Sequence, residues 1–463
     1  MKAKVSKTYL VFIAVLTAIA ATVALTSCQT GGESSSQRTT AAASAATQDE
    51  AAAATLPEGS GSAKLTESDI AVNETIENAE DGGHAIVADG ETLSYANVRV
   101  NKTGEADGDE ADFYGENAAV YAANGGTLTL KDMVVKTDGT HANAVFSYGE
   151  GTTVNIANAY IETSGNCSGG LMTTGGGTMN AENLTINTSG NSSAAIRSDR
   201  GGGTVNVTGG NYTTSGTGSP VIYSTADITV SDATMTSTAS QGVVVEGKNA
   251  VTLNNVNLTA DNNKKNSDKS SRYQAVMIYQ SMSGDAAEGA SRFAMNGGTL
   301  TNQNGDVFFI NNTATEITLN NAQITNNGNG VFLRAAAAGW GSEGSNGGQV
   351  TLNASNQIIN GDMIVDSVSH LNLYLSNNAS FTGAINSSGQ DGEVYVEIED
   401  GSIWTLTGDS YITGMTCGAN AINLNGHKLF IDGTSYTEGS ASFGDPIAVQ
   451  STGNGHGGGN PPA

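Results

Sequence analysis

The sequence predicts an all-β protein, built as a solenoid whose coils are about 25 residues long. The first observation is a repeat: an apolar pair, a glycine-rich corner, an alternation such as TVNV, a small polar corner and another β-rich run recur along the chain. The second is that apolar residues alternate over short stretches, as in a strand with one buried face. The third is that no stretch after residue 80 has helical spacing. Stacked coils would share one continuous core.

The first strand of each coil can be placed by its apolar pair. Between Val120 and Val244 these strands recur in steps of 25, 26, 25, 26 and 22 residues, and later coils are spaced less regularly. The expected first-strand residues are Ile86, Val120, Val145, Leu171, Ile196, Ile222, Val244, Met277, Phe308, Phe332 and Ile364.

A second register supports the coil, two residues after each central strand. Every residue there is Asn, Asp or Gly, the types that most easily adopt the left-handed backbone conformation of a tight corner. Stacked Asn side chains can also hydrogen-bond from one coil to the next. We call this predicted column the corner ladder; its members are Asn97, Asp132, Asn158, Asn183, Gly209, Asp232, Asn255, Gly297 and Asn321.

With this coil length and this corner, residues 80–435 resemble the right-handed parallel β-helices of the pectin-lyase-like superfamily and β-helical bacterial surface adhesins. The resemblance implies a right-handed parallel β-helix. It does not imply one activity, because such folds carry many functions.

The N-terminus reads as an export signal. Three lysines precede an apolar run from about Tyr9 to Leu25, and Leu25-Thr26-Ser27-Cys28 resembles the lipobox of bacterial lipoproteins. That resemblance implies cleavage before Cys28, a lipid on its thiol and, with Gln29 next, exposure on the cell surface. An ordinary signal peptide is the alternative. We expect residues 1–27 to be the signal, 28–63 a flexible tether, 64–445 the β-helix with its caps, and 446–463 a disordered tail.

The charge balance limits the partners. The chain has 19 basic and 45 acidic residues, a net charge of −26, which argues against nucleic acid and anionic membrane surfaces as partners and leaves cations or neutral glycans as ligands. The membrane is expected as a partner only through the lipid. Cys167 and Cys417 fall in distant coils, so we expect two free thiols.

Enzyme signatures of comparable folds are missing. There is no Asp-Asp pair to supply two carboxylates, and the one Gly-His-Gly, residues 455–457, lies in the tail. Arg197, Asp199 and Arg200 fill a repeat corner, which we interpret as structural, with an ion pair across the surface that contributes little; an anion site is the alternative.

Two regions interrupt the repeat. Residues 104–117 form an acidic loop that is either solvated or a Ca²⁺ site, Ca²⁺ being the one possible cofactor. Its candidate ligands are Asp107, Asp109, Asp112 and Glu116.

The second region has three insertions, at 261–272, 281–292 and 334–348, which carry basic residues in an acidic chain. The latter two leave from the same corner of the coil, so we expect a shared rim, whereas 261–272 leaves from another corner. Loops on a rigid scaffold often carry recognition, although simple loop growth is the alternative. The candidate ligand-binding residues are Trp340, Arg334, Arg292 and Tyr279.

Together these features favour a non-catalytic surface protein that acts in adhesion or glycan binding. The alternatives are a polysaccharide lyase or glycoside hydrolase of the pectin-lyase-like fold and a purely structural surface stalk.

Overall fold

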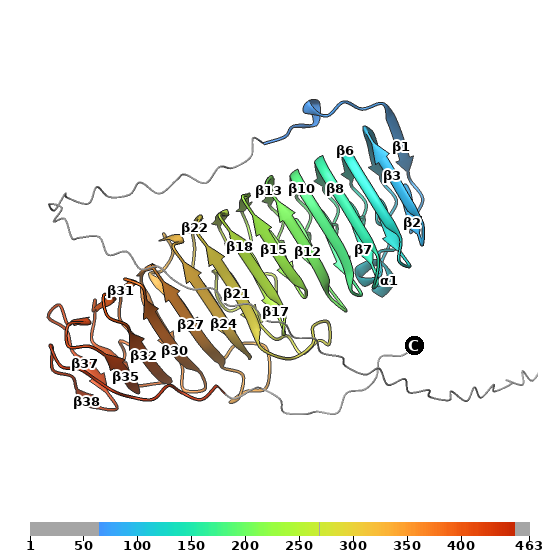
Figure 1. Ribbon diagram of the computed structural model, residues 1–463. Helices are drawn as coiled ribbons and strands as arrows, with labels where there is room; N and C mark the ends of the chain where they lie inside the picture. The colour runs from blue at the N-terminus through green and yellow to red at the C-terminus, as the bar shows by residue number, and fades with distance from the viewer. Residues whose placement is uncertain (1–63, 268, 450–463) are drawn as a thin grey trace, which may run out of the picture. The chain divides into compact units, whose positions relative to one another are not determined.

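The computed structural model describes residues 64–267 and 269–449, and these form a parallel β-helix, as the sequence predicts (Figure 1). The predicted signal (1–27), the whole of the predicted tether with Cys28 (28–63), and residues 450–463 lie outside the described residues. Strands stack coil upon coil along one axis, and the chain advances from β1 at one end to β38 at the other. Within the described residues, no helix has the length and apolar character needed to cross a membrane.

Two long parallel sheets make up the walls of the helix. We call the 11-stranded one the first-strand sheet, because it contains the first strand of each coil. Its strands are β2 (Ile86–Asp89), β5 (Val120–Ala123), β7 (Val145–Tyr148), β9 (Leu171–Thr174), β11 (Ile196–Ser198), β14 (Ile222–Ser224), β17 (Val243–Glu246), β20 (Gln274–Tyr279), β23 (Asp306–Asn311), β26 (Val331–Ala335) and β29 (Asp362–Val365).

The 20-stranded sheet bends around the corner ladder and contains the second and third strands of the coils. In β6, β8 and β10 these two strands run as one through the corner. Its members are β1 (Glu74–Asn78), β3 (Thr92–Ala96), β4 (Val98–Lys102), β6 (Thr127–Thr137), β8 (Thr153–Thr163), β10 (Gly177–Thr188), β12 (Gly203–Thr208), β13 (Asn211–Thr214), β15 (Asp227–Ser231), β16 (Thr234–Ser237), β18 (Ala250–Asn254), β19 (Asn257–Ala260), β21 (Ser291–Asn296), β22 (Thr299–Asn302), β24 (Thr313–Asn320), β25 (Gln323–Asn326), β27 (Gly348–Ser355), β30 (His370–Ser376), β32 (Glu393–Ile398) and β35 (Gly414–Cys417).

The last coils add two small sheets. One contains β28 (Ile358–Asn360), β31 (Ser380–Thr382), β33 (Ile403–Thr405) and β36 (Ile422–Asn423). The other contains β34 (Ser410–Ile412), β37 (Leu429–Ile431) and β38 (Thr434–Ser435). Strands β37 and β38 pair antiparallel, unlike the stacked coils before them. The described helices are the 3₁₀ turn η1 (Glu67–Asp69) and the single α-turn α1 (Asp109–Phe113), which lies inside the predicted acidic loop.

The strand register reproduces the predicted repeat in the early coils. Residues 86, 120, 145, 171, 196 and 222 pair in one continuous row. Later the predictions slip by one residue: Ile222 pairs with Val243 rather than Val244, and Val243 with Val276 rather than Met277. Three consecutive valines at 243–245 leave no alternation from which the inward residue could be read.

The slip returns near the end of the same sheet. Phe308 pairs with Leu333 rather than Phe332, and the pairing of β26 with the next strand, β29, shifts register between Val331 and Leu333. Leu333 in turn pairs with Met363, one residue before the predicted Ile364. A one-residue bulge cannot be recognised from alternation alone.

All nine residues of the corner ladder have left-handed backbone conformations, with φ between 52° and 69°. Asn158 Nδ2 donates a hydrogen bond to Asp132 Oδ1 at 3.2 Å, and Asn183 Nδ2 donates to Asn158 Oδ1 at 2.9 Å. Asn255 makes the same bond to Asp232 at 2.7 Å. The side-chain bonds stop at Gly209, which has no side chain to donate or accept.

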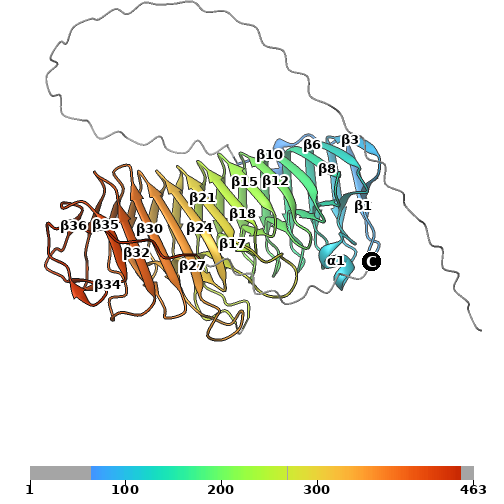
Figure 2. The same cartoon turned by 60° about the horizontal axis from the view of Figure 1, so that its bottom comes forward.

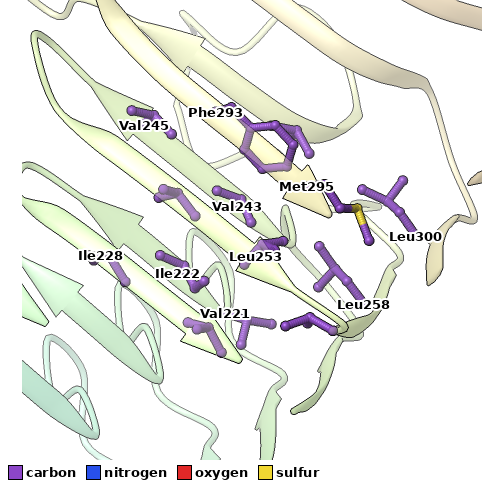
Figure 3. Close-up of a cluster of buried hydrophobic side chains, with 14 of the residues drawn as sticks. Val221, Ile222, Ile228, Val243, Val245, Leu253, Leu258, Phe293, Met295 and Leu300 are labelled. Atoms are coloured by element: carbon purple, nitrogen blue, oxygen red, sulfur yellow. The ribbon is translucent and has the colours of Figure 1, made fainter. Parts of the chain in front are cut away.

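The core is a column of apolar side chains that point inward from all walls (Figure 3). Inward apolar residues of successive coils stack on one another: Ile228 lies beside Val251, which lies beside Phe293. All three are at most 1 % exposed. Burying side chains of this size contributes roughly 1.5–3 kcal/mol each, so the coils stabilise one another through a shared core.

Candidate functional site

The outer face of the first-strand sheet is covered rather than solvated. Its outward residues alternate with the core residues, yet many of them are buried in two clusters outside the main core. The outward row runs through Tyr121, Phe146, Met172, Arg197, Tyr223, Val244, Met277, Phe309 and Arg334. Figure 2 shows α1 and long loops of the later coils on the same side of the helix.

Arg200 connects two of the segments that cover this face. Its Nη1 lies 3.0 Å from Asp109 Oδ2 on α1, and its Nε lies 2.8 Å from Asp285 Oδ1 in the 281–292 insertion. Its guanidinium also lies 3.6 Å from the centre of the Phe113 ring. The charged corner of β11 therefore holds together two excursions of the chain that are far apart in sequence.

Arg197 and Asp199 pair as expected but not across the surface. Arg197 Nη2 donates to Asp199 Oδ2 at 2.7 Å, and the two side chains are only 14 % and 4 % exposed. The covering segments exclude water from the pair, so the expectation of a weak surface ion pair is wrong. A structural role for this corner remains the interpretation that its contacts support.

A buried carboxylate, Glu246 at the end of β17, organises the middle of the face. It is 1 % exposed and accepts hydrogen bonds from the hydroxyls of Tyr223, Tyr279 and Ser281, that of Tyr279 at 2.9 Å. Burial raises the pKa of both tyrosines well above their usual range, with Glu246 adding to the effect. The tyrosines therefore stay protonated, as donors to Glu246 must be.

The predicted ligand-binding residues have different neighbours. Trp340 packs edge-on against Tyr279, with ring centroids 5.1 Å apart, and Tyr279 is only 9 % exposed. Arg334 donates two hydrogen bonds to the buried Asp306 carboxylate, from Nε at 2.7 Å and from Nη2 at 3.2 Å. Arg292 lies on β21 in the other long sheet, 58 % exposed and 3.7 Å from Asp227. The structure thus places Tyr279 and Trp340 together, Arg334 on Asp306, and Arg292 on another wall.

An open pocket lies beside Arg334, where the third strand of a coil turns into the first strand of the next. Three successive coils line it, with side chains that include Arg272, Tyr273, Asn304, Asn327, Asn329 and Arg334. Arg272 ends the 261–272 insertion. Burial and the nearby positive charge of Arg334 lower the pKa of Arg272.

The third insertion therefore joins the same surface, although it leaves from a different corner. A Cβ added to Gly339 in the 334–348 insertion would lie 2.7 Å from Lys269 Cα, so the two insertions touch. The sequence pattern indicates Arg334 but not Asp306, Glu246 or the asparagines of the pocket. The signal for Asp306 is its position as the first residue of a first strand, one coil before the basic residue Arg334.

The acidic loop distributes its carboxylates among different partners. Asp109 pairs with Arg200, and Glu116 packs against Gly82. Asp112 Oδ1 lies 3.0 Å from Nδ1 of His141, and the fully exposed Asp107 lies 3.9 Å from the other ring nitrogen. Among the described residues the four predicted Ca²⁺ ligands do not form one cluster of donor atoms.

His141 instead joins Asp112 to Cys167. One donor atom from each of the three residues lies within 4.8 Å of the others. Asp112 raises the pKa of His141 to about 9, and Cys167 adds to the shift. Cys167 and Cys417 are both free thiols. His141 is not among the residues predicted from the sequence. The observation that could have identified it is its position 26 residues, or one coil, before Cys167.

No protein-family model, no curated protein and no solved structure matches this chain. The parallel β-helix fold rests on the strand pairing, and any function must be argued from the sites themselves.

Proposed function

We propose that this protein is an exported, lipid-anchored β-helix that binds acidic glycans without catalysis, as an adhesin does. The observation that carries the proposal is the gathering of Arg272 and Arg334 in one open pocket of a chain whose net charge is −26. Asp306, which also lines the pocket, pairs with Arg334, so the second guanidinium, that of Arg272, leaves the lining with one positive charge in excess that an anion can pair with. Arginine forks suit the planar carboxylate or sulfate group of a sugar.

The rest of the pocket suits the neutral part of such a ligand. Tyr273 provides an aromatic face, and Asn304 and Asn327, whose amide nitrogens each donate a hydrogen bond within the protein, provide amide oxygens that can accept from sugar hydroxyl groups. Asp306 holds Arg334 with two hydrogen bonds, which fixes the guanidinium before a ligand arrives. The pocket therefore offers charge, ring stacking and hydrogen bonds together.

The same contacts support binding over hydrolysis. A glycosidase needs one carboxyl that gives up a proton and a second carboxylate that attacks or activates water. Asp306 in the pocket is occupied by Arg334, and Glu246 accepts from two tyrosines and a serine. Neither carboxylate is poised for proton transfer to a bound sugar.

The pocket is tested with Arg272→Gln on an array of acidic and neutral glycans. We expect wild type to retain glycans that carry carboxylate or sulfate, and the variant to lose at least about tenfold in affinity, the loss of one charge-assisted contact. Arg292→Gln, which removes an equal charge from an exposed position, serves as the matched control. Equal losses in both variants would point to net charge instead of the pocket. New reducing ends or unsaturated products would establish an enzyme.

The anchor is a separate part of the proposal. The lipobox-like Leu25–Cys28 segment supports acylation of Cys28, and a chain so anchored would present the β-helix away from the membrane. Cys28→Ala should abolish incorporation of labelled fatty acid and move the protein from the membrane fraction to the soluble fraction. A variant that stays acylated would contradict the lipobox interpretation.

A further inference from the structure

A cluster of three different metal-ligand types lies at the other end of the covered face, away from the proposed glycan pocket. His141 and Cys167 occupy the same corner of two consecutive coils, and each backbone N–H bonds to the coil that follows. Asp112 reaches them from α1, the excursion that covers this end of the first-strand sheet. In the part of the chain that the structure describes, it is the one such cluster of His, Cys, Asp or Glu donors.

The imidazole of His141 is oriented toward this cluster but is not satisfied within it. His141 is 5 % exposed, and among the described residues its Nδ1 atom has no hydrogen-bond partner. Asp112 Oδ1 lies 3.0 Å from Nδ1, within the distance of an ion pair but not in the direction of a hydrogen bond. A buried nitrogen without a hydrogen-bond partner destabilises the folded protein, and a bound ligand would satisfy it.

We propose that Asp112, His141 and Cys167 bind one Zn²⁺ ion, through a carboxylate oxygen, Nδ1 and Sγ. Zinc takes these three donor types at about 2.0–2.3 Å, so two donors on one ion lie roughly 3.5 Å apart. The 3.0 Å between Asp112 and Nδ1 already suits a shared ion, and donor atoms within 4.8 Å of one another need only a small closure. The thiolate selects zinc over Ca²⁺, which takes oxygen ligands.

The second nitrogen of His141 has its own partner. Asp107 Oδ1 lies 3.9 Å from Nε2, on a fully exposed side chain, and also accepts a hydrogen bond from the backbone N–H of Gly108 at 2.9 Å. A histidine that binds zinc through one nitrogen usually donates the other N–H to a carboxylate, which fixes the ring. Asp107 is thus a positioning residue, and the acidic loop contributes one ligand and one positioning group. Three protein ligands leave the fourth position of the ion open.

The backbone at this corner is consistent with selection for these side chains. His141 and Cys167 have φ of 56° and 55°, a left-handed conformation that cysteine seldom adopts. The next two coils place Ser192 and Gly218 at the same corner. Glycine would occupy this corner without strain, yet the two coils that α1 covers have histidine and cysteine there. This supports a role for the two side chains themselves.

Metal binding is tested on the purified full chain, stripped with a chelator and kept reduced without added thiols. We expect one Zn²⁺ per chain in competition with a chromogenic chelator. With Co²⁺ as the probe, we expect a thiolate charge-transfer band and the visible bands of tetrahedral cobalt. Cys167→Ser should lose the charge-transfer band, whereas Cys417→Ser, which removes the other described thiol, should keep it. Asp112→Asn should weaken Zn²⁺ binding at least about 100-fold, and Asp107→Asn about tenfold with the cobalt bands retained.

Two results would overturn the site. One is a wild-type chain that binds no Zn²⁺ at micromolar concentrations, and the other is a wild-type cobalt spectrum in Cys167→Ser. If Cys167→Ser does not fold, Asp112→Asn still tests the site, because Asp112 lies outside the stacked coils and its replacement should not prevent folding. Unchanged Zn²⁺ affinity in that variant would also exclude the site. None of these outcomes depends on glycan binding.

Discussion

The corner ladder and the outer face of the first-strand sheet are built from the same coils but differ in regularity. At the corner ladder, one residue per coil has the same φ and the same role, and no insertion occurs in the nine predicted coils. On the outer face, neighbouring coils carry Met172, Arg197, Tyr223 and Val244 in one row. The first region repeats because each coil must turn there, whereas the second is free to vary.

This difference separates what the fold needs from what a function can use. Asn, Asp or Gly adopts the left-handed conformation of the corner with little strain, and successive corners stack without contacts from other segments of the chain. The outer face gathers buried charges such as Glu246 and Asp306, each of which is paired by residues from elsewhere in the chain. Charge burial of this kind costs stability and needs long-range contacts, which is why it marks candidate sites.

The largest expected effect tests the buried charge on the outer face. Arg197→Met leaves the Asp199 carboxylate buried without its guanidinium partner, so the free energy of unfolding should fall by about 3–5 kcal/mol. Urea unfolding followed by circular dichroism measures this loss, and hydrogen exchange at β11 locates it. The double variant Arg197→Met/Asp199→Asn should recover part of it, since no charge then remains unpaired.

Arg292→Met, in the other long sheet, is the matched control. Arg292 and Asp227 are 58 % and 69 % exposed, so losing their contact should cost less than about 1 kcal/mol. If the two single variants lost equal stability, the outer face would not differ from an ordinary solvated sheet, and the comparison with the corner ladder would fail.

The same difference explains how much the sequence could predict. The coil length, the strand type and the corner ladder depend on residues close together in sequence, so a single chain reveals them. The contacts of Arg200 join it to Asp109 and Asp285, 91 and 85 residues away. Insertions that fold back across several coils have no fixed register, so the repeat alone does not show that Arg292 belongs to β21 in the other long sheet while Trp340 packs against Tyr279. His141 and Cys167 are intermediate, because their shared register is visible once the coil is known.

A smaller effect tests the regular region. Asn158→Val should lower the free energy of unfolding by about 1–3 kcal/mol, the range for a residue forced into a strained backbone conformation. Asn158 has φ of 52°, and a β-branched side chain resists that conformation. The change also removes the bond to Asp132 and leaves Asn183 without its acceptor. Thr204→Val, at an exposed position in β12, introduces the same side chain without these losses and should be nearly neutral.

Asn158→Gly separates the two causes of that loss. Glycine adopts the left-handed conformation without strain, as Gly209 and Gly297 do in the same column, so only the ladder hydrogen bonds disappear. Its melting temperature should lie between those of wild type and Asn158→Val. If Asn158→Val had the same melting temperature as Thr204→Val, the left-handed conformation at this corner would not contribute to stability. If glycine were as harmful as valine, the stacked amides would matter more than the conformation, and the corner ladder would owe its uniformity to side-chain bonding between coils.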